Sequence, residues 1–239
     1  MSDCAIILAG GSGSRMRGVV RDKVLEELLG LPVILHSFKA FADSKKVDTV
    51  VFVCRDDAQQ AEISKSLVKF LPNESAKIEV IYARGGAERR DSVLNGLRVL
   101  ADRNGIVFIH DGARPLVGAE NIIRLSDTAK CDGSAVLASK VVDTIKRIPS
   151  QKENLSTRLL EDLDRSTLWA MQTPQVFEIN AIHQAYEKIV AEEIFITDDV
   201  AVANYAGIGV SIVENLTPNP KITVPSDIAY IEFLTSHKK

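Results

Sequence analysis

A chain of 239 residues is long enough for one large α/β domain, and two small domains would also fit. Hydrophobic residues make up 46% of the chain and aromatic residues only 5%, so aliphatic side chains must form the core, as in a sheet covered by helices. The 29 Lys and Arg against 32 Asp and Glu give a net charge of -3, which argues against a nucleic-acid-binding protein. Any polyanionic ligand must therefore be held by a local group of cations.

The first half of the chain alternates strand-like and helical patterns. Short apolar runs predict buried strands at 4–8, 49–54, 78–82 and 106–109. Amphipathic segments between them predict helices at 32–42, 58–70 and 92–101. This alternation predicts an α/β fold of three layers, in which a mostly parallel, twisted sheet carries helices on both faces and right-handed crossovers join its strands.

The alternation breaks after Ala138. Residues 139–165 are polar, mix strand-like pieces with a loop and lack the pattern of a helix. We interpret this stretch as an inserted arm that projects from a single 1–239 domain. Beyond it, we expect helices near 180–191 and 198–205, a strand at 210–214 and a last helix from Ser226.

The three cysteines are widely spaced, and Cys4 and Cys54 lie in strand-like runs, so we expect buried thiols there. The sequence contains no CxxC or HxxxH pair, so we expect no structural zinc site. The N-terminus lacks a targeting pattern, and no stretch approaches the length needed to cross a bilayer. We therefore expect a cytoplasmic protein without a membrane partner.

A glycine-rich loop within 8–16 (LAGGSGSRM) directly follows the first predicted strand. Glycines let a backbone approach an anion closely, so that several N–H groups can converge on phosphate oxygens. Two familiar phosphate motifs fail here: a P-loop needs Lys and Ser or Thr after its last glycine, and a dinucleotide fingerprint starting at Gly11 needs glycine where Met16 stands. An ordinary tight turn is the alternative.

Cations crowd behind this loop, at Arg15, Arg17, Arg21 and Lys23. On most surfaces such a run is a solvated face. The carboxyl end of a parallel strand is where α/β proteins bind ligands, and this placement favours phosphate binding.

A second motif, HDGARP at 110–115, follows another buried strand. Asp111 at this position can share Mg²⁺ with a triphosphate, because magnesium prefers one or two carboxylates together with phosphate oxygens. The alternative is a turn stabilised by Asp111 and Gly112.

Nine blocks occur in a fixed order over nearly the whole chain: GGSGSRM, Lys23 within DKVLEELLGLPVI, GGAERRDSVLNGL at 85–97, HDGARP, VVDTIKR at 141–147, Arg165, QTPQVF at 172–177, ITDD at 196–199 and NPKITVPSD at 219–227. Together they resemble the 2-C-methyl-D-erythritol 4-phosphate cytidylyltransferase family of the non-mevalonate isoprenoid route. Asp22 stands where that family commonly has proline, Pro220 where it has an apolar residue, and Ala9-Gly10-Gly11 where it has Ala-Ala-Gly.

The resemblance implies a nucleotide-diphospho-sugar transferase-like fold with a projecting β-arm. It implies an enzyme that transfers CMP from CTP to 2-C-methyl-D-erythritol 4-phosphate and releases pyrophosphate, with Mg²⁺ or another divalent cation as cofactor. A homodimer is implied, with the arm at 139–165 in the dimer contact, whereas no nucleic-acid partner and no fused cyclase are expected.

The resemblance also assigns residues. Arg15 and Lys23 would stabilise the transition state, and Asp111 would bind the metal. The residues implied to bind CTP are Ala9, Gly10, Gly11, Gly13, Gly86, Ala87, Arg89 and Ser92, with Gly85 beside them. Those implied to bind the acceptor are Thr144, Arg165, Lys221, Arg114 and Thr173. Thr144 and Arg165 would serve the neighbouring subunit's site, and Asp91 or Ser92 could also simply cap a helix.

Three alternatives remain beside this interpretation. D-ribitol 5-phosphate cytidylyltransferase shares the fold and much of the motif set, although HDGARP and GGAERRDSV favour the isoprenoid enzyme. A non-catalytic nucleotide-binding regulatory protein could retain the fold without turnover. A nicotinamide oxidoreductase is disfavoured by the failed fingerprint.

Overall fold

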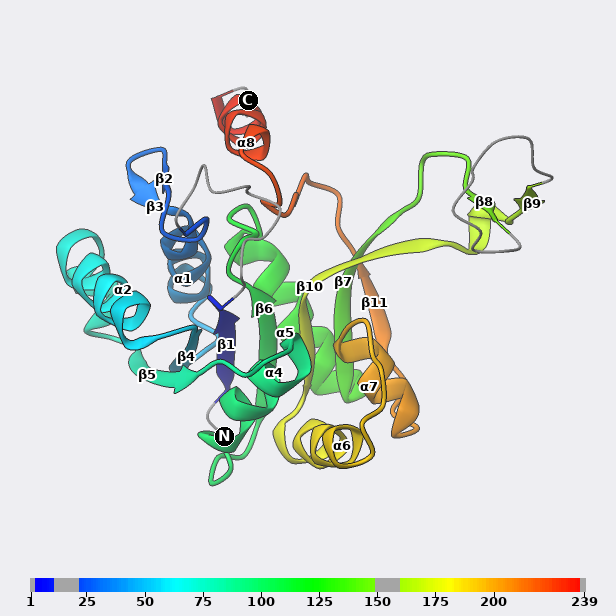
Figure 1. Ribbon diagram of the computed structural model, residues 1–239, viewed down its shortest axis with the longest axis horizontal. Helices are drawn as coiled ribbons and strands as arrows, with labels where there is room; N and C mark the ends of the chain where they lie inside the picture. The colour runs from blue at the N-terminus through cyan, green and yellow to red at the C-terminus, as the bar shows by residue number, and fades with distance from the viewer. Residues whose placement is uncertain (1–2, 11–21, 149–159, 237–239) are drawn as a thin grey trace.

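The computed structural model describes residues 3–10, 22–148 and 160–236, and its centre is a seven-stranded sheet in the order β11-β7-β10-β6-β1-β4-β5 (Figure 1). The strands of this sheet are β1 Cys4–Leu8, β4 Thr49–Cys54, β5 Glu79–Arg84, β6 Ile106–Asp111, β7 Ser134–Lys140, β10 Trp169–Glu178 and β11 Ser211–Glu214. Only β10 runs antiparallel to its neighbours, β6 and β7, while the other pairs in the sheet are parallel. The predicted mostly parallel sheet is confirmed.

Helices cover both faces of the sheet, which confirms the three layers. Their bounds are α1 Val33–Ser44, α2 Asp57–Phe70, α3 Pro72–Ser75, α4 Arg89–Arg98, α5 Ala119–Asp132, α6 Ile179–Ala191, α7 Asp199–Tyr205 and α8 Ser226–Ser236. One buried cluster joins the sheet to α1, α2 and α5, and a second joins it to α4, α6 and α7. Within the described ranges, every helix is too short or too polar to pass through a bilayer.

Strand β1 shows how the sequence builds these two layers. All five of its residues are buried, with Ala5 and Ile7 in one cluster and Cys4, Ile6 and Leu8 in the other. Successive side chains of a strand point to opposite faces, so a continuously apolar run supplies both cores at once.

Strand β1 also marks the point where the chain connections diverge. Strands β4 and β5 follow on one side of it, and β6 lies on the other. Leu8 pairs in register with Asp111, so the ends of β1 and β6 meet. The crevice outside such a switch point is where open α/β sheets bind ligands. The N–H groups of Ala9 and Gly10 both donate to the Val53 carbonyl at 3.0 Å, which fixes the start of the glycine loop against β4.

Strands β7 and β10 lead out of the sheet into the arm. Two short antiparallel strands, β8 Lys146–Arg147 and β9 Glu161–Asp162, pair beyond them, and Figure 1 shows this ribbon projecting away from the body. A single 3-10 turn, η2 Arg165–Thr167, follows. The predicted β-arm is present, although β7 continues in register with β10 to Lys140, two residues into the stretch predicted as insertion.

Four parts of the fold differ from the sequence prediction. Helix α5 was missed, although Ile122, Leu125 and Ala129 repeat at helical spacing and are buried. Strand β10 was also missed. A small hairpin, β2 Glu27–Leu28 with β3 Leu31–Pro32, precedes α1. Helix α4 begins at Arg89 and not at the predicted residue 92, because Glu88 and Asp91 form a capping box three residues earlier.

Candidate active site

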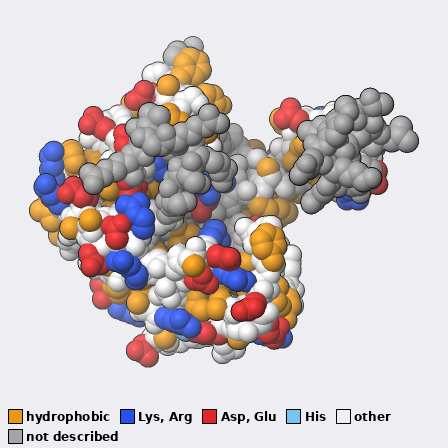
Figure 2. Space-filling view, viewed as in Figure 1, with side chains coloured by type: hydrophobic (Ala, Val, Ile, Leu, Met, Phe, Trp, Pro, Cys, Tyr) orange, Lys and Arg blue, Asp and Glu red, His pale blue; other side chains and the backbone are white. Residues whose placement is uncertain are grey.

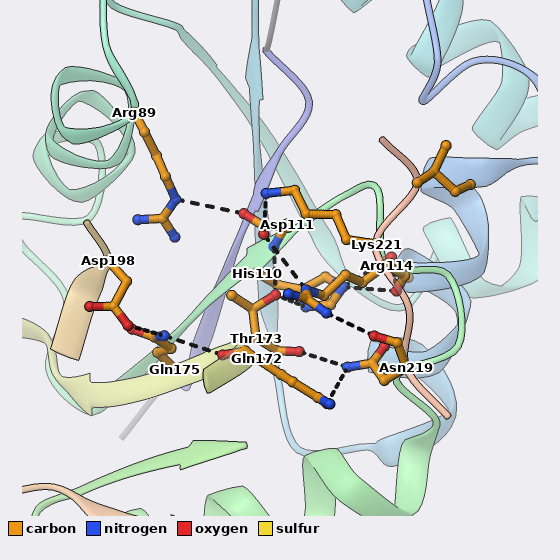
Figure 3. Close-up of polar contacts among 12 residues, drawn as sticks. Arg89, His110, Asp111, Arg114, Gln172, Thr173, Gln175, Asp198, Asn219 and Lys221 are labelled. Atoms are coloured by element: carbon orange, nitrogen blue, oxygen red, sulfur yellow. Dashed lines mark hydrogen bonds and ion pairs between the residues drawn. The ribbon is translucent and has the colours of Figure 1, made fainter. Parts of the chain in front are cut away.

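Asp111, the last residue of β6, lies at the centre of a cluster of cations (Figure 3). Its Oδ2 accepts a hydrogen bond from Lys221 Nζ at 2.7 Å. Arg89 Nε lies 3.6 Å from Oδ1, and Arg114 Nε lies 3.7 Å from Oδ2. Four predicted site residues from three separate parts of the chain therefore meet at the switch point of the sheet.

The charges in this cluster keep Asp111 ionised. Burial alone would raise the pKa of its carboxyl, but the positive charges of Lys221 and Arg89, and of Arg114 after them, hold that pKa well below its usual range. Burial lowers the pKa of the Arg114 guanidinium, while Asp111 acts in the opposite direction. One carboxylate faces three cations, so the cluster carries an excess of positive charge available to an anionic ligand.

His110 anchors the backbone beneath Asp111. Burial lowers the pKa of its imidazole to about 4, so the ring is neutral at pH 7. The Arg114 carbonyl, 3.3 Å from Nε2, can only accept, so Nε2 carries the proton and Nδ1 accepts from Thr173 Oγ1 at 3.2 Å. Thr173 Oγ1 in turn accepts from the N–H of Asp111 at 3.0 Å. Thr173, predicted to bind the acceptor, is buried and supports Asp111 from β10.

The segment 219–222 brings two lysines to the same rim. Arg114 Nη1 donates to the Asn219 carbonyl at 2.8 Å, and the N–H of Ile222 donates to the Ala113 carbonyl at 2.9 Å. Lys221 reaches Asp111 from this anchored segment, and Lys23 Nζ donates to the Ile222 carbonyl at 3.2 Å. Lys23 and Lys221 are separated by almost the whole chain, yet Lys23 contacts the residue that follows Lys221.

A cavity of about 330 Å³, smaller than the one at the base of the arm, adjoins the start of the glycine loop. It is lined by Gly10, Arg55, Gly85, Gly86, Ala87, Glu88 and Arg89. Of the residues predicted to bind CTP, Gly10, Gly86, Ala87 and Arg89 lie around it. Ala9 is buried at the end of β1. Ser92 accepts from the Gly86 N–H at 3.0 Å and donates to the Glu88 carbonyl at 3.1 Å, so it holds the cavity wall.

Gly86 is required by the close approach of this wall to α4. A Cβ at position 86 would lie 2.2 Å from Asp91 Cβ, which no side chain can tolerate without movement of the loop. At Gly85 and Gly86 the loop therefore presents only backbone to the cavity.

Arg89 makes its strongest contacts away from the cavity. Its Nη1 and Nη2 donate to the two carboxylate oxygens of Asp199, both at 2.7 Å. Asp199 is fully buried at the start of α7 and also accepts from the hydroxyl of buried Tyr186. Burial opposes the charge on Arg89, but Asp199 and Asp111 hold its pKa well above the usual value. The guanidinium is thereby fixed with its Nε toward Asp111.

Two predicted acceptor residues lie elsewhere, at the base of the arm. Arg165 is exposed, donates to the Val142 carbonyl at 2.6 Å and lines a cavity of about 530 Å³ with Lys140, Val141, Val142, Asp164 and Ser166. Thr144 is exposed on the same arm. Among the described residues, no hydrogen bond or ion pair joins either of them to the Asp111 cluster.

Three predicted residues, Gly11, Gly13 and Arg15, lie outside the described residues. Sequence reasoning in turn missed several residues that build the site. Asp199 and Tyr186 hold Arg89, and Asn219 accepts a hydrogen bond from Arg114. Gln59 donates to Asp22, and Arg55 lines the smaller cavity. The motifs ITDD and NPKITVPSD contain two of them and were the available signal.

The donor set around Asp111 fits a magnesium ion that arrives with a nucleotide. Oδ2 is engaged by Lys221, while the nearest cation to Oδ1 is Arg89 at 3.6 Å. No group of three or more His, Cys, Asp or Glu in the described ranges could hold a metal by itself. One ionised carboxylate combined with phosphate oxygens is a set that Mg²⁺ favours.

The surface shown in Figure 2 carries acidic and basic side chains interspersed, and no broad patch of one sign covers its described part. This agrees with the small net charge of -3. The positive charge that an anionic ligand needs is local, at the Asp111 cluster.

Comparison with known proteins finds relatives over the whole length. The family model described as IspD, 2-C-methyl-D-erythritol 4-phosphate cytidylyltransferase, matches residues 4–237. The chloroplastic 2-C-methyl-D-erythritol 4-phosphate cytidylyltransferase of Oryza sativa subsp. japonica is 37% identical over 233 residues, which are 98% of this chain and 74% of the relative. The enzyme of that name from Bacillus velezensis is 35% identical over 233 residues, 97% of this chain and 95% of its own. The solved structure of 4-diphosphocytidyl-2C-methyl-D-erythritol synthase from Anaerococcus prevotii is 26% identical, with a TM-score of 0.83, and the match covers 99% of this chain and 96% of that one.

Proposed function

The chain belongs to the 2-C-methyl-D-erythritol 4-phosphate cytidylyltransferase family, and we propose that the Asp111 cluster is the place where the reaction of that family occurs. The protein transfers CMP from CTP to 2-C-methyl-D-erythritol 4-phosphate, a reaction of isoprenoid biosynthesis. An oxygen of the acceptor phosphate attacks the α-phosphorus of CTP. The bond from that phosphorus to the oxygen bridging the β-phosphate breaks, and pyrophosphate leaves with the electron pair.

The observation that carries this placement is the convergence of Lys221, Arg114 and Arg89 on one rim of the sheet, with Lys23 beside them. The acceptor dianion must approach a tetraanion, and two unit charges about 4 Å apart repel by roughly 4 kcal/mol at an effective dielectric constant of 20. Several such pairs act at once, so the reaction needs fixed cations before the phosphates can meet. A general base is unnecessary, because a phosphate monoester with a second pKa near 6 is already ionised at neutral pH.

Lys221 and Arg114 are the residues that we assign to the acceptor phosphate. Lys221 is partly exposed, and its ammonium already contacts a carboxylate that a phosphate can replace as its partner. Arg114 Nε is buried 3.7 Å from Asp111 Oδ2, and Nη1 donates to the Asn219 carbonyl, so the guanidinium charge is held in place at the rim. Lys23 is assigned to stabilise charge at the reacting phosphorus, as is Arg15, which lies outside the described residues.

CTP is assigned to the smaller cavity and the glycine loop beside it. The backbone at Gly85 and Gly86 can meet the edge of the base without interference from a side chain of its own, and Ala9 and Gly10 lead toward the triphosphate. Arg89 fits a different role from the one its sequence context implied, because Asp199 engages both ends of its guanidinium. It supports Asp111 from the border of the cavity.

Asp111 would hold a divalent cation, with the remaining ligands supplied by phosphate oxygens and water. When bound, such an ion neutralises charge on the triphosphate and makes the α-phosphorus more electrophilic. Lys221, Arg114 and Arg89 keep the carboxylate ionised and oriented whether or not the ion is present.

The position of the arm supports a homodimer. Arg165 and Thr144 are exposed on a ribbon that projects from the body, which favours contact with the acceptor bound in a neighbouring subunit. Mixing Arg165→Ala and Lys221→Ala subunits tests this arrangement. Mixed dimers would contain one intact site, so roughly a quarter of the wild-type activity should return. No recovery, or a fully active monomer in sedimentation, would contradict a shared site.

The assay that tests the function is pyrophosphate release from CTP with 2-C-methyl-D-erythritol 4-phosphate and, separately, with D-ribitol 5-phosphate. We expect the first acceptor to give the larger kcat/KM. A larger value with ribitol phosphate would assign the second activity instead, and no release with any sugar phosphate would indicate a binding protein. The cytoplasmic location stays a prediction, since the rice relative is named chloroplastic.

A further inference from the structure

Asp22, the residue before Lys23, makes several contacts and has no assigned role in the proposed reaction. Its side chain is only 10% exposed. Oδ2 accepts from Gln59 Nε2 at 2.6 Å and lies 3.1 Å from Arg55 Nη1. Oδ1 accepts from the N–H of Val24 at 3.3 Å. The Asp22 carboxylate therefore contacts the backbone of Val24, just after Lys23, and two side chains more than 30 residues away in the sequence.

Gln59, in the first turn of α2, connects this carboxylate to the glycine loop. It is 2% exposed, and its Nε2 also donates to the carbonyl of Ala9 at 3.2 Å. Its Oε1 accepts from the N–H of Arg55 at 2.7 Å. One buried amide thus joins the end of β1, the end of β4 and Asp22.

Lys23 depends on this connection for its position. A lysine side chain extends only a limited distance from its Cα, so the position of the Lys23 backbone limits which groups its ammonium can reach. The residue before Lys23, Asp22, accepts a hydrogen bond from Gln59. The residue after it, Val24, accepts at its carbonyl from the N–H of Ile34 at 2.9 Å. The ammonium then reaches the Ile222 carbonyl, next to Lys221.

We propose that Asp22 is a positioning residue that, through Gln59 and Arg55, fixes the backbone of Lys23 relative to the loop that begins at Ala9. This inference rests on the proposed function and deepens it. The loop is assigned to the triphosphate and Lys23 to the reacting phosphorus, so the Asp22–Gln59 contact sets the distance between two halves of one site. A shift of about 1 Å between such groups can cost ~10²-fold in rate.

The test compares Asp22→Ala, Asp22→Asn and Gln59→Leu with wild type. We expect kcat at saturating CTP and acceptor to fall roughly 10- to 100-fold for Asp22→Ala, with KM for each substrate changed less than about threefold, because the binding groups themselves remain. Asp22→Asn keeps one acceptor oxygen and should lose less than Asp22→Ala. Asp22→Ala/Gln59→Leu should be little worse than the poorer single variant, because both remove one connection.

Asp57→Asn is the matched control. Asp57 lies on α2, the helix that carries Gln59, and pairs with Arg84 at 2.9 Å on the open surface. Its kcat should stay within about twofold of wild type. Thermal unfolding of each variant confirms that it is folded at the assay temperature. A folded Asp22→Ala protein with wild-type kcat would overturn the positioning role while leaving the function intact. A wild-type protein that releases no pyrophosphate would instead overturn the function itself.

Discussion

The buried contact between Arg89 and Asp199 should contribute far more to stability than a similar arginine–carboxylate pair on the surface. Asp199→Asn keeps the shape of the side chain and removes its charge. Glu187→Gln makes the same change in the Arg98–Glu187 pair, which joins α4 to α6 through two hydrogen bonds of 3.0 and 3.1 Å. Both pairs are two-pronged and extend from α4, so burial is the variable that separates them.

The structure sets the expected magnitudes. Asp199 is fully buried, and Arg89 is 30% exposed. Removing one partner of a buried pair costs about 3–5 kcal/mol, and the partial exposure of Arg89 and its remaining contact with Asp111 favour the lower end, about 3 kcal/mol. Glu187 and Arg98 are 47% and 53% exposed, so that pair should contribute less than ~1 kcal/mol. For a chain of this length a loss of about 3 kcal/mol corresponds to a fall of roughly 6–12 °C in Tm for Asp199→Asn.

Differential scanning calorimetry of wild type and both variants measures this difference, and urea unfolding with an unchanged m-value checks that the unfolded state is the same. We expect Asp199→Asn to unfold at least about 6 °C below wild type and Glu187→Gln within about 3 °C of it. Equal Tm values for the two variants would refute the reasoning, because burial would then have no bearing on the energy of the pair.

Two further predictions concern the cavity wall and the thiols. Gly86→Ala should lower the free energy of unfolding by about 1–3 kcal/mol and raise KM for CTP, because its Cβ would lie 2.2 Å from Asp91 Cβ. Gly209→Ala is the control, since a Cβ there would meet open space. Equal unfolding free energies for the two variants would contradict the clash. Burial raises the pKa of Cys4 to about 11 and of Cys54 to about 12. The thiolate is the reactive form, so at pH 8 a thiol reagent should modify only exposed Cys131 before unfolding and all three cysteines after it; modification of a second thiol in the native protein would contradict the burial.

The fold was predictable where the sequence pattern is local. Strands 4–8 and 49–54 were predicted with their observed bounds, because continuous apolar runs buried on both faces have no other stable arrangement in a chain of this composition. Strand β10 was missed because its start is partly exposed and polar residues and a proline interrupt its middle, so the sequence lacks a strand pattern there.

The candidate site was predictable as a set of residues but not as a set of contacts. Lys221 and Asp111 were both chosen from motifs, yet nothing in the sequence states that they lie 2.7 Å apart. Arg89 was predicted to bind CTP from its motif, whereas its contact with Asp199 spans 110 positions and depends on the packing of α7 against α6. Sequence patterns locate the ends of strands, and long-range packing decides which charges meet there.

The measurement that tests the central claim most directly is the steady-state kinetics of Lys221→Met beside Lys39→Met. Lys221 contacts Asp111 at the rim, and Lys39 makes an equally short contact of 2.7 Å with Asp43 on the open surface of α1. We expect Lys221→Met to lower kcat/KM for 2-C-methyl-D-erythritol 4-phosphate by at least ~10², and Lys39→Met to leave it within about twofold of wild type. Near-normal kcat/KM in a folded Lys221→Met protein would contradict the claim that this group of cations brings the two phosphates together.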